Sequence, residues 1–148
     1  MKPTFVLFNQ EKSKVAVNLR HVMWLDVYLD KVLMSLETVA QKLSAQTGPK
    51  THSQIIQKIA ADYHVVTIDQ FGASVMTTRS ATATVVVLVH DSRKTIIFPR
   101  GLKTIGFSKT PDDKYGEIAV HAHNESWVIK GPVVDSDSIV KILDLISL

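Results

Sequence analysis

The chain has 148 residues, a formal net charge of +3 and a pI of about 9.2, and 45% of its residues are hydrophobic. This composition is ordinary for a globular protein, and the length is sufficient to bury a hydrophobic core without metals or disulfides. Because the sequence contains no cysteine, it excludes a disulfide framework, a thiol nucleophile and cysteine-ligated metal clusters.

The apolar runs of the sequence are short. None approaches the roughly 20 residues that a membrane-spanning helix needs. The N-terminal residues fit no signal peptide. We therefore expect one domain over residues 1–148, located in the cytoplasm and without a membrane partner.

A strand–turn–strand pattern occurs twice in the chain. Residues 4–9 and 14–18 predict a first β-hairpin, which is followed by Arg20. Residues 84–98 predict a second hairpin, which is followed by Arg100. When the two copies are aligned on their strands, the second copy has one residue fewer between the hairpin and its arginine. We therefore expect each hairpin to be followed by a turn that carries an arginine. The sequence leaves open whether the two copies are a true repeat or two similar hairpins.

The segment between the two hairpins predicts helices. Residues 22–28 indicate a third strand or the start of a helix. Residues 31–46 predict an amphipathic helix, because apolar side chains recur there at helical spacing. These side chains are Val32, Leu36, Val39, Ala40 and Leu43. Residues 52–63 predict a second helix, which the capping-box pair Thr51 and Gln54 would open.

The run Val85 to Val89 is apolar on both faces of a strand. We therefore expect this strand to be central in a sheet or covered by a partner. Residues 65–68 indicate a short strand before it, whereas residues 70–82 are small and polar and indicate no element.

The C-terminal third predicts one more hairpin and a helix. Residues 117–122 and 126–131 alternate in polarity across a turn, and one face of the hairpin would be apolar. That face would hold Ile118, Val120, Ala122, Trp127 and Ile129. Residues 136–147 predict a helix capped by Ser136 or Asp135. Its core-facing residues would be Ile139, Ile142, Leu143 and Ile146.

The order of these elements predicts an α+β fold with a mainly antiparallel sheet built from hairpins, two central helices and a C-terminal helix. Val85–Val89 and the terminal helix carry more apolar surface than one side of a small sheet hides. Because large exposed apolar areas are unusual on monomers, we expect a homodimer.

Two histidines are the best candidates for a metal site. His121 and His123 alternate along a strand, so both imidazoles would share one face. A zinc site needs three or four ligands, and the local sequence supplies no third one. Whether these histidines bind a metal stays open, and the sequence predicts no cofactor.

The basic segment 93–114 is the best candidate for a binding surface. Long cationic side chains suit phosphate groups, whereas the same side chains at hairpin tips also serve solubility. We predict nucleic acid as the ligand, with its phosphate backbone contacted by Arg93, Lys94, Arg100, Lys103 and Lys130.

Two segments show partial resemblances to known families. The sequence of residues 55–71 resembles the opening of the DNA-binding helical domain of bacterial replication initiators, but that family's later signature is absent. Residues 95–146 are similar in layout to LytTR-type output domains, with strands, a lysine-rich turn, a hairpin and a short helix, but share no specific residue motif with them. We interpret both resemblances as coincidence and carry no family residue over.

Three hypotheses about function follow. The first is a non-enzymatic binding or regulatory module with nucleic acid as its leading ligand, because no catalytic or nucleotide-binding motif is present. The alternative is a protein-interaction module such as an inhibitor, adaptor or assembly subunit. The third is an enzyme whose site is assembled only in the fold.

Overall fold

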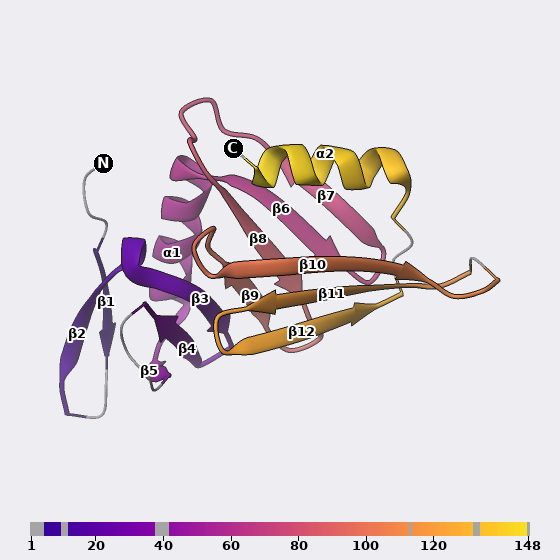
Figure 1. The fold of residues 1–148 in the computed structure, drawn as a ribbon. Coiled ribbons are helices and arrows are strands. Elements are labelled where there is room, and N and C mark those ends of the chain that lie inside the picture. The colour runs from indigo at the N-terminus through magenta and orange to yellow at the C-terminus, as the bar shows by residue number, and fades with distance from the viewer. Residues whose placement is uncertain (1–4, 10–11, 38–41, 113, 132–133, 148) are drawn as a thin grey trace.

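The computed structural model describes residues 5–9, 12–37, 42–112, 114–131 and 134–147. These residues form a mainly β structure with mostly antiparallel sheets and two α-helices (Figure 1). The larger sheet has nine strands and the smaller sheet has three. Among the residues described, no helix combines the length and apolar character that crossing a membrane requires.

The nine-stranded sheet is formed by the first two thirds of the chain. Its strands are β1 (Phe5–Asn9), β2 (Lys14–Asn18), β3 (Val22–Val27), β4 (Lys31–Leu36), β5 (Leu43–Gln46), β6 (His64–Asp69), β7 (Gly72–Met76), β8 (Thr84–Val89) and β9 (Lys94–Ile97). Their order across the sheet is β2-β1-β5-β4-β3-β9-β8-β6-β7. Only the β6–β8 pair is parallel among the described pairings.

The remaining elements flank this sheet. The smaller sheet contains β10 (Leu102–Lys109), β11 (Gly116–Ala122) and β12 (Glu125–Lys130). The helices are α1 (Pro49–Asp62), α2 (Ser136–Ile146) and a single 3-10 turn, η1 (Leu19–His21). The smaller sheet and α2 lie together on one side of the large sheet, as Figure 1 shows.

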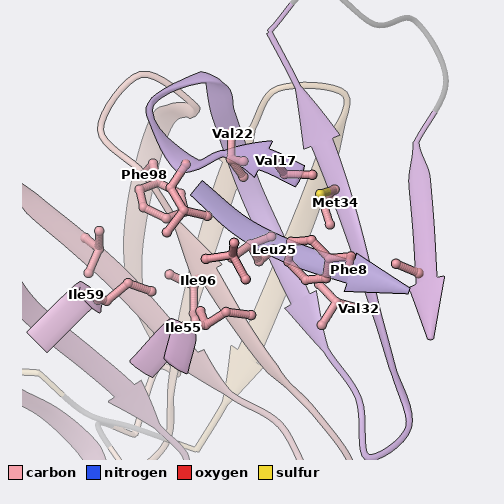
Figure 2. Packing of buried hydrophobic residues seen from close by; sticks show 14 residues of the cluster. Phe8, Val17, Val22, Leu25, Val32, Met34, Ile55, Ile59, Ile96 and Phe98 are labelled. Atoms are coloured by element: carbon pink, nitrogen blue, oxygen red, sulfur yellow. The ribbon is translucent and has the colours of Figure 1, made fainter. Parts of the chain in front are cut away.

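Two apolar clusters hold these layers together. The first cluster joins Ile55 and Ile59 of α1 to Phe8 and Leu25 of the large sheet (Figure 2). The second joins the opposite face of the large sheet to the small sheet and α2, through Trp24, Val86, Ile118, Trp127 and Ile142. The central strands are therefore buried on both faces, because each face has its own apolar partner layer.

The hairpin predictions and the mainly antiparallel α+β class are confirmed, but the predicted helix over residues 31–46 is wrong. This segment forms β4 and β5 instead. The apolar positions Val32, Met34 and Leu36 also alternate, and β4 pairs with β3 on one side and β5 on the other. Pairing with both neighbours outweighs local helical spacing, which is a weak preference. The predicted positions Val39 and Ala40 lie outside the described residues.

The helix over residues 52–63 is confirmed, but the expected cap is wrong. Helix α1 begins at Pro49, and its N-cap is Gly48, which makes no side-chain cap bond. Proline is favoured in this first helical position because its missing N–H would be unpaired there in any case. Thr51 therefore lies inside the helix.

The C-terminal helix is confirmed, with Asp135 as its cap: the carboxylate accepts a 2.8 Å hydrogen bond from the Ser138 N–H. Ile142 is buried as predicted, whereas Leu143 is 45% exposed and does not face the core. In the small sheet, the five residues predicted to share one face are all buried.

The two arginine-bearing hairpins have the same register. Leu7 pairs with Ala16 in the first hairpin, and Val87 pairs with Ile96 in the second, so the offset is 80 residues in both strands. The sequence alignment with one residue fewer in the second copy is therefore wrong. The order hairpin, three strands and helix also recurs, first in β1–β5 with α1 and then in β8–β12 with α2.

Strand β8 is central, as predicted. Val85, Val86 and Leu88 are completely buried, because α1 covers one face and the small sheet with α2 covers the other. The apolar surface of this strand is therefore used inside the fold, and the part of the homodimer argument that rested on it is wrong. The homodimer itself stays a prediction.

Candidate nucleic-acid interface

The five predicted nucleic-acid-binding residues lie in three places. Arg93 lies in the β8–β9 turn and Lys94 begins β9, whereas Arg100 and Lys103 follow β9 at its other end. Lys130 ends β12, one residue after Ile129, which pairs with Ile118. Lys103 adjoins the opposite end of the small sheet, since the neighbouring Leu102 pairs with Ala122. The structure therefore brings four of these residues together as two pairs beyond opposite ends of β9 and places Lys130 apart from both pairs.

The turn after β9 packs tightly against the start of β3. The Phe98 N–H donates a 3.0 Å hydrogen bond to the Met23 carbonyl. A Cβ added at Gly101 would overlap the Met23 carbonyl oxygen and lie 2.7 Å from its carbonyl carbon. Glycine is therefore required by the close approach of the two backbones. This contact joins the end of one hairpin to the strand that follows the other.

Arg20 and Arg100 line one cavity of about 200 Å³. Arg20 lies in η1 and Arg100 in the turn after β9, at equivalent positions 80 residues apart. The apolar part of the cavity wall consists of Leu19, Val22, Ala83, Phe98 and Pro99. Figure 2 shows Val22 and Phe98 at the same end of the apolar cluster. The two arginine turns that the sequence pattern singled out thus converge on one depression.

Local hydrogen bonds hold both arginine turns in position. The Asn18 side chain caps η1 by accepting a 3.1 Å hydrogen bond from the Arg20 N–H. The Arg100 guanidinium donates a hydrogen bond to Glu37. The other carboxylate oxygen of Glu37 lies 3.1 Å from His21 Nδ1.

The Glu37 carboxylate is held in its ionised form. The hydrogen bond from His21 is the main cause that lowers the pKa of Glu37, and Arg100 lowers it further, while partial burial opposes both. The Arg100–Glu37 ion pair remains accessible to solvent, with side-chain exposed fractions of 59% for Arg100 and 26% for Glu37. Glu37 therefore orients Arg100 without withdrawing the guanidinium from solvent.

Tyr63, directly after α1, also lines this cavity. Its ring meets Phe98 edge to face, with centroids 5.6 Å apart. Burial is the main cause that raises the pKa of the Tyr63 hydroxyl. The hydroxyl is therefore protonated at neutral pH and can donate a hydrogen bond.

Arg79 lies at the same end of α1 and was not among the predicted residues. Its neighbours Thr78 and Ser80 donate side-chain hydrogen bonds to the carbonyls of Ala60 and Ala61 in the last turn of α1. Three of the four arginines of the chain, Arg20, Arg79 and Arg100, therefore lie around this region. We call these three arginines together with Tyr63 the arginine end. Segment 70–82 carried no pattern that indicated Arg79.

The histidines proposed as a metal site lie on the small sheet. His121 is exposed on β11, whereas His123 lies in the turn after it, where its carbonyl accepts a 2.8 Å hydrogen bond from Trp24 Nε1. His123 Nε2 lies 3.2 Å from the side-chain amide of Asn124. Within the described part of the chain, no group of three or more potential ligands could hold a metal ion.

Comparisons with known proteins give little guidance. No family model matches the chain, and no curated protein matches it. Among solved structures, one match is the LytTR DNA-binding domain of a protein described as a methyl-accepting/DNA response regulator from Bacillus cereus. That match is 11% identical, has a TM-score of 0.48 and covers 100% of both chains. A likeness at this level carries no argument about function.

Proposed function

We propose that the protein is a non-enzymatic module that binds nucleic acid at the arginine end. The observation that carries this proposal is the convergence of Arg20 and Arg100 on one cavity. Guanidinium groups match the geometry of phosphate oxygens and are less strongly hydrated than ammonium groups. A pair of them beside a tyrosine hydroxyl donor suits a phosphate backbone better than an isolated cation does.

Two of the five predicted residues, Arg100 and Lys103, belong to this proposal, together with Arg20 and Arg79. Lys103 is exposed three residues after Arg100. The other predicted residues serve as controls, because they lie at the opposite end of β9 or at the far end of the small sheet: Arg93, Lys94 and Lys130.

Fluorescence anisotropy with mixed DNA and RNA oligonucleotides at low salt tests the proposal. Phosphate contacts release counterions, so affinity should fall steeply as salt rises. We expect Arg20→Ala and Arg100→Ala each to lower the slope of log affinity against log salt by about one unit, without changing sequence preference. Lys130→Ala, which removes the same charge elsewhere, should leave that slope nearly unchanged.

Two results would overturn the proposal. One is no binding at tens of micromolar protein. The other is an equal loss of salt dependence in Lys130→Ala and Arg100→Ala, which would mean that only net charge matters. Circular dichroism of each variant separates loss of contact from loss of folding.

Removing the charge of the Glu37 carboxylate should strengthen nucleic-acid binding rather than weaken it. Glu37→Gln removes a negative charge beside Arg100 and frees the guanidinium for phosphate. We expect affinity at low salt to rise roughly twofold to fivefold, which is the range for an exposed ion pair. Glu117→Gln, the same change opposite Lys130 on the small sheet, should raise it less. Weaker binding by Glu37→Gln would show that orienting Arg100 matters more than freeing it.

A protein-interaction module is the second candidate, and β1 supports it. Phe5 and Leu7 share the outer face of this strand and are 55% and 52% exposed. Adjacent exposed apolar side chains near the edge of a sheet are typical of contact surfaces. If the oligonucleotides do not bind, a protein-interaction function becomes the favoured one.

A further inference from the structure

A second cavity, of about 360 Å³, lies at the end of the large sheet that is opposite the arginine end. It is a shallow depression that is open to solvent and is bordered by the β3–β4 turn, the β8–β9 turn and α1. Its wall contains apolar side chains, among them Leu29 and Ile56, and polar ones, among them His90, Ser92, Arg93 and Lys94. The volume lies at the lower end of the range for small-molecule sites, and a wall that carries both apolar and charged side chains suits an amphiphilic ligand.

Cations gather around the ring of Tyr28. Lys31 Nζ lies 4.8 Å from the ring centroid and Arg93 Cζ lies 5.6 Å from it. Such contacts fix the position of long cationic side chains beside an aromatic ring. The wall of the cavity itself carries two cations, Arg93 and Lys94, and one carboxylate, Asp91. The Asp26 carboxylate lies 3.6 Å from Arg93 Nε, and Lys31 lies over Tyr28, so three cations and two carboxylates surround the cavity and leave one positive charge in excess.

The Arg93 guanidinium lacks a hydrogen-bonded partner among the described residues. Its Nε lies 3.6 Å from the Asp26 carboxylate, which is beyond hydrogen-bond distance, and this Nε is buried and unsatisfied. A guanidinium has five N–H donors, and leaving buried donors unpaired is costly. The terminal N–H groups of Arg93, whose side chain is 30% exposed, are the donors that an anion in the cavity can reach, since no described residue accepts a hydrogen bond from them.

A buried chain of hydrogen bonds fixes His90 in the wall. The Thr95 hydroxyl donates to Asp26, whose side chain is only 6% exposed. Because this donation uses the only hydroxyl proton, Thr95 Oγ1 must accept from His90 Nε2, which lies 3.0 Å away. His90 Nδ1 then remains as an acceptor, and no residue that the structure describes donates to it. Burial, followed by the charge of Arg93, lowers the pKa of His90, which keeps the ring neutral.

We propose that this cavity binds a small organic anion: a phosphate or carboxylate group carried on an apolar body. Arg93 and Lys94 hold the anionic group, and Leu29 and Ile56 contact the apolar body. His90 Nδ1 accepts a hydrogen bond from a hydroxyl or N–H of the ligand. This inference is independent of nucleic-acid binding at the arginine end.

Nuclear magnetic resonance titration of the full chain with four probes tests the proposal. The probes are phenyl phosphate, benzoate, inorganic phosphate and benzyl alcohol. We expect phenyl phosphate or benzoate to shift the amide signals of Leu29, His90 and Lys94, and to bind at least several-fold more tightly than the other two. Which of the two anions binds more tightly identifies the anionic group. Equal binding of benzyl alcohol, or no shifts at these amides with any probe at ten-millimolar concentration, overturns the proposal.

Surface variants keep the test free of folding effects. Lys94→Ala and Leu29→Ala change exposed side chains, and Leu29 is 90% exposed. We expect Lys94→Ala to weaken binding of the anionic probe roughly twofold to fivefold, the range for an exposed ion pair. Leu29→Ala should weaken the aromatic probes but not inorganic phosphate. Lys103→Ala, beyond the other end of β9, should leave binding unchanged. An equal loss in Lys94→Ala and Lys103→Ala refutes a local site.

Discussion

Replacing Gly101 with alanine is expected to lower the free energy of unfolding by about 3 kcal/mol, because overpacking against a rigid backbone forces a main-chain shift. The new Cβ would overlap the Met23 carbonyl and lie 2.9 Å from the Met23 Cα. Backbone atoms in a paired strand cannot rotate away as a side chain does. Urea denaturation followed by circular dichroism measures the loss.

The same change should also impair the arginine end. Gly101 follows Arg100 directly, and its close approach to β3 holds the turn beside η1. A shift of this turn would move Arg100 away from Arg20 and reduce the salt dependence of nucleic-acid binding in the fraction that remains folded.

Gly106→Ala is the matched control. Gly106 lies in β10, and a Cβ there would come no closer than 3.9 Å to the Ala119 carbonyl oxygen. We expect stability to change by no more than about 0.5 kcal/mol, as is usual for surface substitutions. If Gly101→Ala proves as stable as Gly106→Ala, the two turns are not held together by backbone contact.

Local patterns predicted the hairpins well because their partners are close in sequence. In the β11–β12 hairpin, polarity alternates and the turn is short, so register and faces follow directly from the residues. The same reasoning applies to the β1–β2 and β8–β9 hairpins. The residues before the last amphipathic run likewise predicted a cap at Ser136 or Asp135, and Asp135 is the cap of α2.

Elements with distant partners were the ones that sequence reasoning missed. Strand β4 was mistaken for part of a helix because the spacing of Val32 and Leu36 fits both a helix and an alternating strand. Strand β5 pairs with β4 and with the distant β1. Strand β7 consists mainly of small residues, which give no strand pattern by themselves. It can be recognised as a strand only from its pairing with β6, in which Val75 lies opposite Val66. Tertiary pairing decides such segments, and a single sequence shows no trace of it.

The candidate sites divide in the same way. Charge along the sequence indicated Arg93 and Arg100 together, but β9 places them at opposite ends of one strand. The twofold pattern drew attention to Arg20 without including it in the site. One signal was overlooked: Asp26 lies within an otherwise apolar strand, and a buried carboxylate needs polar partners. Of those partners, Arg93 lines the second cavity, and Thr95 is hydrogen-bonded to His90 in its wall.

Trp24→Ala should be the most destabilising single change in the chain. The Trp24 side chain is completely buried in β3 and meets Trp127 of the small sheet edge to face, with centroids 5.4 Å apart. Its Nε1 also donates a hydrogen bond to the His123 carbonyl in the β11–β12 turn. Removing the indole leaves a cavity between the two sheets, for which we expect a loss of roughly 3–5 kcal/mol.

Trp24→Phe separates the two contributions of this side chain. Phenylalanine keeps most of the aromatic contact with Trp127 but cannot donate to the His123 carbonyl. We expect it to cost roughly 1–2 kcal/mol, the penalty of leaving a buried acceptor unpaired. Thermal unfolding monitored by the fluorescence of Trp127, the remaining tryptophan, measures both variants against the parent chain. If Trp24→Ala were no more destabilising than Trp24→Phe, packing at this position would contribute little, and the small sheet would have to be held to the large one through other residues.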